Sequence, residues 1–270
     1  MSLDLTAPRD VSLDHLRYIR EKRAYKQKVR VCQVLLLIAA LAFWEIATQL
    51  RWIDPFIFSS PSRVINTLIS LHQEGNLYEH IGITLYETAA GFILGTLIGT
   101  AVAIILWWSD FLAEVLDQYL VVLNSLPKIA LGPIIIVWFG AGASAIIVVA
   151  LLVSVIVTIL GVYSGFSQVD PDKVKLLKTF GATKLQVLQK VILPASVPTI
   201  ISALKINVGL AWVGVIVGEF LVSRAGLGYL IVYGGQVFRL DLVMASVIIL
   251  SLAAALMYQA VVYLEKIITR

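Results

Sequence analysis

The sequence predicts an all-helical integral membrane protein that crosses the bilayer six times. Hydrophobic residues make up 59% of its 270 residues and charged residues 14%, with a mean hydropathy of +0.91. Soluble domains carry about 25% charged residues. Six apolar runs are long enough for membrane helices, which need about 20 apolar residues each. These runs are residues 31–50, 81–108, 116–138, 143–166, 197–221 and 242–268.

The N-terminal residues 1–30 are expected to form a segment separate from the membrane domain at 31–270. They hold eight Lys or Arg residues and no apolar core, so they are not a signal peptide. A short apolar stripe of Leu13, Leu16 and Ile19 favours an interfacial helix over residues 12–30. A partly disordered basic tail is the alternative.

Several of the predicted elements are interrupted or short. Ser125-Leu126-Pro127 and Gly132-Pro133 break the third span, which is tolerated where the break faces protein or a water-filled path. Ser59-Ser60-Pro61-Ser62 predicts the start of a short amphipathic helix after the first span. Residues 224–240 are too broken for a span and predict a short helix at the outer face.

Gly91, Gly95 and Gly99 lie four residues apart in the second span, so they share one helix face. Bare backbone on one face lets another helix approach closely. The glycines therefore predict a packing interface, either within the bundle or between two copies. A membrane helix that is merely rich in glycine is the alternative.

The distribution of Lys and Arg predicts the orientation. With both termini inside, the cytoplasmic segments and Lys266 hold 15 basic residues, against four outside. This excess explains the isoelectric point near 9.1 without a nucleic-acid partner. Residues 167–196 then face the cytoplasm.

This cytoplasmic stretch reads as two short helices around a bend. Asp170 suits the N-cap, Pro171 the first helical position and Asp172 the positive end of the helix dipole. Gly181 ends the first helix. Val174, Leu177 and Phe180 are expected to share its apolar face.

The second helix is expected to run from Thr183 to Leu193. Thr183 and Gln186 have the spacing of a capping box, and Pro194 is expected to end the helix. Its apolar face is predicted to hold Leu185, Leu188 and Ile192.

Polar side chains inside spans are candidates for the transport pathway, because they are costly in hydrocarbon. The candidates are Asn124, Ser125, Lys128, Trp212 and Glu219. Lys128 beside the break would suit an anionic substrate, and a structural ion pair or carbonyl contact is its alternative. For Glu219, a purely structural role with a hydrogen-bonding or ionic partner is an equal alternative. The side chain of Lys205 is expected to reach toward the inner membrane interface.

The residues give no support for an enzyme. No catalytic constellation or metal-ligand spacing is present, and the single Cys32 excludes an internal disulfide. The sequence also lacks a Gly-x-x-x-x-Gly-Lys-Ser/Thr phosphate loop, so ATP hydrolysis by that route needs another polypeptide.

Residues 175–194 resemble the cytoplasmic loop of permease subunits of binding-protein-dependent ABC importers. That signature runs Glu-Ala-Ala, three residues, Gly, nine residues, a branched apolar residue, one residue and Leu-Pro. Gly181, Val191 and Leu193-Pro194 match it in register. Lys175-Leu176-Leu177 stands where the family has Glu-Ala-Ala, a departure that falls on the contact with the ATPase. We call residues 167–196 the coupling segment.

Further pieces resemble the branch that serves nitrate, sulfonate, taurine, bicarbonate and some vitamin precursors. They are Pro61-Ser62-Arg63-Val64, Trp138-Phe139-Gly140, Ala211-Trp212 with Glu219, and Gly226-Leu227-Gly228. The resemblance implies a type I importer permease fold and a substrate that is a small anion. A vitamin precursor is the alternative substrate, and an ion-gradient transporter using Lys128 and Glu219 is the alternative class.

The resemblance also implies partners. Two ATPase subunits, which bind ATP and Mg²⁺, would receive the coupling segment, while a substrate-binding protein docks outside. A second permease copy would complete the complex in the bacterial inner membrane, and this chain itself needs no cofactor. The implied ATPase contacts are Asp172, Lys175, Leu177, Phe180, Gly181, Ala182, Thr183, Leu185, Leu193 and Pro194.

Overall fold

A computed structural model describes residues 13–268 of the chain, and nearly all of them are helical. Contacts divide the chain into two units, residues 1–63 and 64–270. The all-helical prediction is confirmed. Five helices are long and apolar enough to cross a membrane, and a bent helix pair raises the number to six if that pair is one span.

The first unit is built on one long helix, α1 (Leu13–Gln49). An interfacial helix separate from the first span was predicted up to residue 30, but α1 runs through that point without a break. The physical reason is that residues 13–49 contain neither glycine nor proline. Helix α2 (Pro55–Phe58) follows, capped by Asp54, whose Oδ1 accepts from the Phe56 N–H at 2.8 Å.

Helix α3 (Pro61–Gln73) begins where the serine-rich stretch predicted a short helix. Its N-terminus is held by Glu45 of α1, which accepts from the Ser62 N–H at 3.0 Å and from Ser62 Oγ at 2.9 Å. Glu45 therefore has a structural role, because it satisfies a free N–H at the start of a helix.

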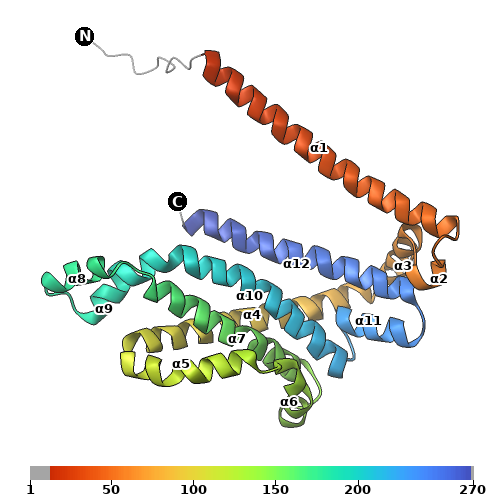
Figure 1. Ribbon diagram of the computed structural model, residues 1–270. Helices are drawn as coiled ribbons and strands as arrows, with labels where there is room; N and C mark the ends of the chain where they lie inside the picture. The colour runs from red at the N-terminus through yellow and green to blue at the C-terminus, as the bar shows by residue number, and fades with distance from the viewer. Residues whose placement is uncertain (1–12, 269–270) are drawn as a thin grey trace. The chain divides into compact units, whose positions relative to one another are not determined.

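The second unit is organised around three long helices that lie side by side (Figure 1): α4 (Leu77–Trp108), α7 (Ala143–Ser167) and α10 (Leu193–Val222). The short helix α11 (Leu227–Gln236), which the sequence predicted, packs with α12 (Leu240–Ile268). In Figure 1, α11 lies at one end of this unit and the coupling segment at the other.

The predicted break in the third span is present. Helix α5 (Asp110–Ser125) is followed by its capping residue Leu126, and the 3-10 turn η1 (Lys128–Leu131) leads into α6 (Gly132–Phe139). The two parts meet at 83°. Pro127 lies at this bend, where it cannot donate the N–H that would continue α5.

The glycines of α4 face small side chains of α7 in the same chain, in the pairs Gly91–Ala150, Gly95–Ser154 and Gly99–Thr158. A Cβ atom added at Gly91 would lie 2.8 Å from Ala150 Cβ, and one at Gly99 would lie 2.6 Å from Thr158 Cβ. Such distances are below van der Waals contact, so only glycine permits this helix approach. The glycine face is therefore used within the bundle.

Lys205, which was expected to reach toward the inner interface, pairs with Glu265 of α12 at 2.7 Å. Both side chains are mostly buried. The pair joins α10 to α12 and neutralises two charges that would be costly in hydrocarbon.

Candidate functional site

The coupling segment begins where α7 ends. Helix α8 (Pro171–Thr179) starts at Asp170, whose Oδ1 accepts from the Asp172 N–H at 2.9 Å. Lys175 pairs with Asp172 at 3.1 Å, one turn away, and both side chains are exposed. Lys175, which departs from the family signature, is thus paired within its own helix, and its side chain remains accessible to a partner.

Gly181 forms the bend between the two helices. Its φ is +77°, a conformation that glycine adopts without strain. The Gly181 N–H donates to the Lys178 carbonyl at 3.0 Å, and the Ala182 N–H donates to the Leu177 carbonyl at 3.1 Å. These bonds satisfy the end of α8 and turn the chain sharply.

The predicted capping box after the bend is present. Gln186 N–H donates to Thr183 Oγ1 at 3.3 Å, and Thr183 N–H donates to Gln186 Oε1 at 2.8 Å. Helix α9 (Lys184–Val187) therefore starts with its first donors satisfied.

The prediction that Pro194 ends this helix is wrong. Helix α9 continues through the π-helical turn η2 (Leu188–Ile192) into α10, giving one helical run from Lys184 to Val222. In η2 the Leu193 N–H donates to the Leu188 carbonyl, five residues back. The wider turn accommodates Pro194, which would clash with the carbonyl four residues back in a regular α-helix. The coupling segment is therefore rigidly joined to α10.

The inner face of the segment packs on the ends of α4 and α7. Val187, Leu188 and Ile192 are buried in one cluster with three residues of those helices, Ala103, Val162 and Phe166. From α8, Val174 and Leu177 pack against this cluster. A movement of the segment must therefore displace the ends of these helices, because protein interiors are close-packed.

The outer face presents apolar side chains to the surroundings. Phe180 is 80% exposed, Leu176 55% and Leu185 50%. Phe180 was predicted to share an apolar face with Val174 and Leu177, but α8 ends at Thr179, so Phe180 lies outside that face. Leu185 was grouped with Leu188 and Ile192, but it is half exposed whereas those two residues are buried. We call Leu176, Phe180 and Leu185 the exposed tip.

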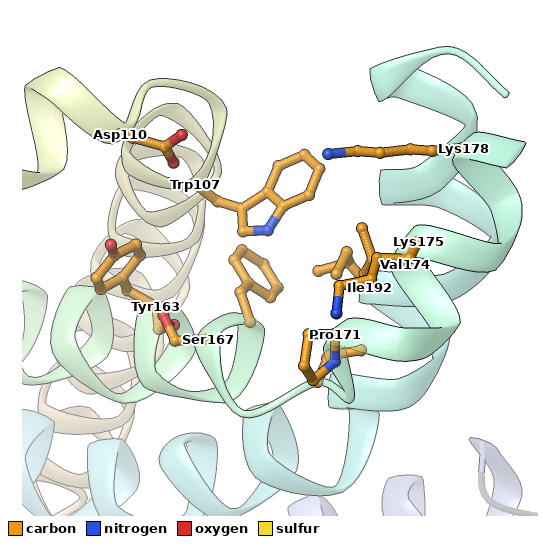
Figure 2. A pocket seen from close by; sticks show the side chains of 11 residues that line it. Trp107, Asp110, Tyr163, Ser167, Pro171, Val174, Lys175, Lys178 and Ile192 are labelled. Atoms are coloured by element: carbon orange, nitrogen blue, oxygen red, sulfur yellow. Dashed lines mark hydrogen bonds between the residues drawn. The ribbon is translucent and has the colours of Figure 1, made fainter. Parts of the chain in front are cut away.

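A cavity of about 390 Å³ lies between α8 and the ends of α4 and α7. Figure 2 shows Lys178 extending from α8 toward the indole ring of Trp107. Nearby, Lys184 donates to the Trp108 carbonyl at 2.7 Å, and its Nζ lies 5.5 Å from the centre of the Trp107 ring. The start of α9 is thus held to the end of α4, while space remains beneath α8.

Three of the pathway candidates gather at the bend after α5. Lys128 Nζ donates to the Asn124 carbonyl at 2.9 Å, and Ser125 Oγ donates to the Val121 carbonyl at 3.0 Å. Lys128 thus satisfies a carbonyl at the C-terminus of α5, where a cation is favourable. Asn124 and Ser125 are exposed in the single chain.

The other two candidates do not join them. Trp212 is 4% exposed within a core cluster, and Glu219 is 1% exposed. Glu219 accepts from Thr84 Oγ1 at 2.6 Å and from the Gly228 N–H at 2.5 Å. Sequence reasoning missed Thr84, because nothing near it in the chain indicates a distant carboxylate partner. Both side chains are closed to solvent in this structure.

A bundle of long apolar helices, with a bent helix pair and a capped loop joined to α10, defines a multi-pass membrane protein. The family model for the binding-protein-dependent transport system inner membrane component matches residues 91–270. The chain belongs to this family of ABC importer permeases. As such it is not an enzyme, and ATP is bound by a separate ATPase subunit of the importer.

Individual proteins agree with this assignment. The chain is 33% identical over 238 residues to a "Probable ABC transporter permease protein" of Haemophilus influenzae, covering 88% of this chain and 96% of the relative. It is 24% identical over 260 residues to the taurine transport system permease protein TauC of Escherichia coli, covering 94% of each. Its fold is similar to a chain of a bacterial ABC transporter involved in import of the acidic polysaccharide alginate. That match has a TM-score of 0.66 and 14% identity, and covers 94% of this chain and 99% of the other.

Proposed function

We propose that this permease forms the substrate pathway of an importer for small sulfonate-type anions and is driven through its coupling segment. The observation that carries the coupling role is the exposed tip, an apolar patch formed by Leu176, Phe180 and Leu185 at the bend between α8 and α9. Large exposed apolar groups of this kind mark interaction sites. The partner proposed for it is the ATPase subunit.

The mechanism follows from the continuity of α9 with α10. Closure of two ATPase subunits on ATP would shift the exposed tip, and the unbroken helical run from Lys184 to Val222 would carry that shift along α10. Helix α10 cannot slide alone, because Gly214 lies directly against Ala150 of α7. We therefore expect α10, α7 and α4 to move together as the pathway changes from inward-open to outward-open.

The proposed assembly contains two permease copies, two ATPase subunits and an external binding protein. The excess of Lys and Arg supports an inner-membrane orientation with both termini and the coupling segment in the cytoplasm. Residues 18–30 would then meet the anionic headgroups of the inner leaflet.

Two observations support the proposed substrate class: the names of similar permeases and the position of Lys128. Similar permeases carry names for the transport of aliphatic sulfonates and taurine. Lys128, at the bend between α5 and α6, would attract a sulfonate, with Asn124 and Ser125 beside it. A vitamin precursor is the second candidate, because another relative is a formylaminopyrimidine transport permease.

We expect the Lys128→Ala variant to lower the rate of taurine uptake by about tenfold, the effect of losing one charge-assisted contact. The measurement is ATP-driven uptake of labelled taurine into proteoliposomes that contain the complete transporter. Lys266→Ala removes an exposed lysine of α12, outside both the bend and the coupling segment, and serves as the matched control. Equal uptake by both variants and the wild type would remove Lys128 from the pathway, and uptake of formylaminopyrimidine alone would favour the second substrate class.

The Gly181→Val variant tests the coupling role. Valine at φ +77° is strained by about 1 to 2 kcal/mol, so the bend should relax and displace the exposed tip. We expect the membrane insertion of the variant to be normal and its ATP hydrolysis to continue without substrate uptake. Both rates are measured on the same proteoliposomes.

Gly75 provides a matched control for that variant. It has φ +80°, and as at Gly181 a Cβ atom added there would have no neighbour within 4 Å. Gly75→Val therefore imposes the same backbone strain outside the coupling segment. Uptake that is equally normal in both variants would contradict the proposed role of the bend.

A further inference from the structure

Two carboxyl groups lie side by side in the interior of the second unit. Glu87 of α4 and Glu219 of α10 are each 1% exposed. Glu87 lies one helical turn from Thr84, whose Oγ1 donates to Glu219 Oε1 at 2.6 Å, so the two carboxyl groups share one buried site. Both helices are membrane spans. A buried carboxyl pair in a span is costly and therefore needs a physical account.

Glu219 is the acceptor of this pair. Its Oε1 accepts from Thr84 Oγ1 at 2.6 Å, and its Oε2 accepts from the N–H groups of Gly228 at 2.5 Å and Tyr229 at 3.3 Å. The two N–H groups belong to the first turn of α11, where the helix dipole favours a negative charge. These donors suit an ionised carboxylate.

Glu87 lacks such donors. Its Oε2 has no hydrogen-bond partner, and neither ion pair found among residues 18–267 involves Glu87 or Glu219. Two adjacent carboxylates without a cation cannot both be ionised in an apolar interior. Because the donors around Glu219 suit its ionised form, Glu87 is the group left to carry a proton.

The pair belongs to a larger junction that holds the start of α11. The Gly226 N–H donates to His80 Nδ1 at 2.9 Å, and the Leu227 N–H donates to Thr84 Oγ1 at 2.8 Å. With Gly228 and Tyr229, four consecutive N–H groups find side-chain acceptors on α4 and α10. Because Nδ1 of His80 accepts, this imidazole is held neutral in the junction.

The close approach of the α11 backbone to Glu219 requires glycine at positions 226 and 228. A Cβ atom added at Gly226 would lie 2.5 Å from the Glu219 carboxyl group, and one at Gly228 would lie 2.7 Å from Oε2. The backbone thus approaches the carboxylate as closely as a hydrogen bond allows. This fit indicates a fixed attachment of α11 to α4 and α10.

We propose that Glu87 and Glu219 hold a single proton between them and act as positioning residues that fasten α11 to the three-helix core. Glu87 is the proton carrier and Glu219 the acceptor for α11. Helix α11 lies at the end of the unit opposite the coupling segment (Figure 1), which is the outer end in the proposed orientation. The fastening then lets an external binding protein that presses on α11 act on α4 and α10; this consequence rests on the proposed function.

The first test reads the proton directly. Infrared spectroscopy of the purified chain in nanodiscs should show the carbonyl band of a buried protonated carboxyl group, with a shift in D₂O. Glu87→Gln should remove this band, whereas Glu79→Gln, an exposed glutamate on the same helix, should leave it. Persistence of the band in Glu87→Gln would overturn the proposal. This measurement uses neither ATP nor a binding protein, so it is independent of the proposed function.

The second test uses the complete transporter. Glu87→Gln keeps a donor toward Glu219, so stimulation of ATP hydrolysis by the binding protein should stay within about twofold of wild type. Glu219→Gln sets an amide N–H₂ against the donors of α11 or Thr84, and stimulation should fall about tenfold or more while basal hydrolysis persists. Equal stimulation in the two variants would overturn the assignment of donor and acceptor. If Glu219→Gln does not accumulate, the infrared result with Glu87→Gln decides.

Discussion

The Phe180→Asp variant is expected to reach the membrane at the wild-type level and to lose ATP-driven uptake. Phe180 is the most exposed member of the exposed tip and packs on nothing that the bundle needs for folding. Aromatic anchors at interfaces contribute about 2 kcal/mol or more, so the ATPase should bind the variant about 30-fold more weakly. Co-purification of the ATPase and substrate uptake measure the two effects.

Phe238→Asp is the control for this substitution. Phe238 is 67% exposed in the turn between α11 and α12, at the other end of the unit. This variant should retain the ATPase in full. Full retention by Phe180→Asp as well would show that the exposed tip is not the contact surface.

The local structure of the coupling segment could be predicted because its signals act over four residues or fewer. Asp170 and Thr183 bond to N–H groups two and three residues ahead, and Gly181 adopts the conformation for which glycine is selected. Capping interactions of this kind depend on sequence spacing alone. The break at Pro127 was predictable for the same reason.

The faces and the end of the second helix could not be predicted in this way. A proline is compatible with a continuing helix when a π-turn precedes it, and the packing of Leu188 and Ile192 on the bundle stabilises η2. Phe180 and Leu185 have the spacing of buried residues, but the segment extends past the core at those positions. Helical periodicity gives an angle around the axis and does not show where the neighbouring helices end.

Glu219 illustrates the same limit for a candidate site residue. From sequence it was a polar group in a span, with a pathway role and a structural role both open. Its partners Thr84 and Glu87 lie more than 130 residues away, and only the fold brings them together. The loop Gly226-Leu227-Gly228 was identified from sequence only by its resemblance to the permease family. The structure shows that a side chain at either glycine would collide with the Glu219 carboxyl group.

The crossing of α4, α7 and α10 at Ala150 should be the most sensitive point for folding. A Cβ atom added at Gly91 would lie 2.8 Å from Ala150 Cβ, and one added at Gly214 would collide with the Ala150 backbone. Backbone cannot move aside as a flexible side chain can. Gly214→Val is therefore expected to destabilise the protein by about 3 kcal/mol or more, measured by unfolding in mixed micelles.

Gly209→Val, on the same helix, separates packing from helix propensity. Gly209 is exposed, and a Cβ atom there would have no neighbour within 4 Å. Valine is a better helix former than glycine by about 0.5 kcal/mol, so this variant should be as stable as the wild type or slightly more stable. If both variants were equally stable, α10 would not be locked to α7, and a movement of the coupling segment could shift α10 without α7 and α4.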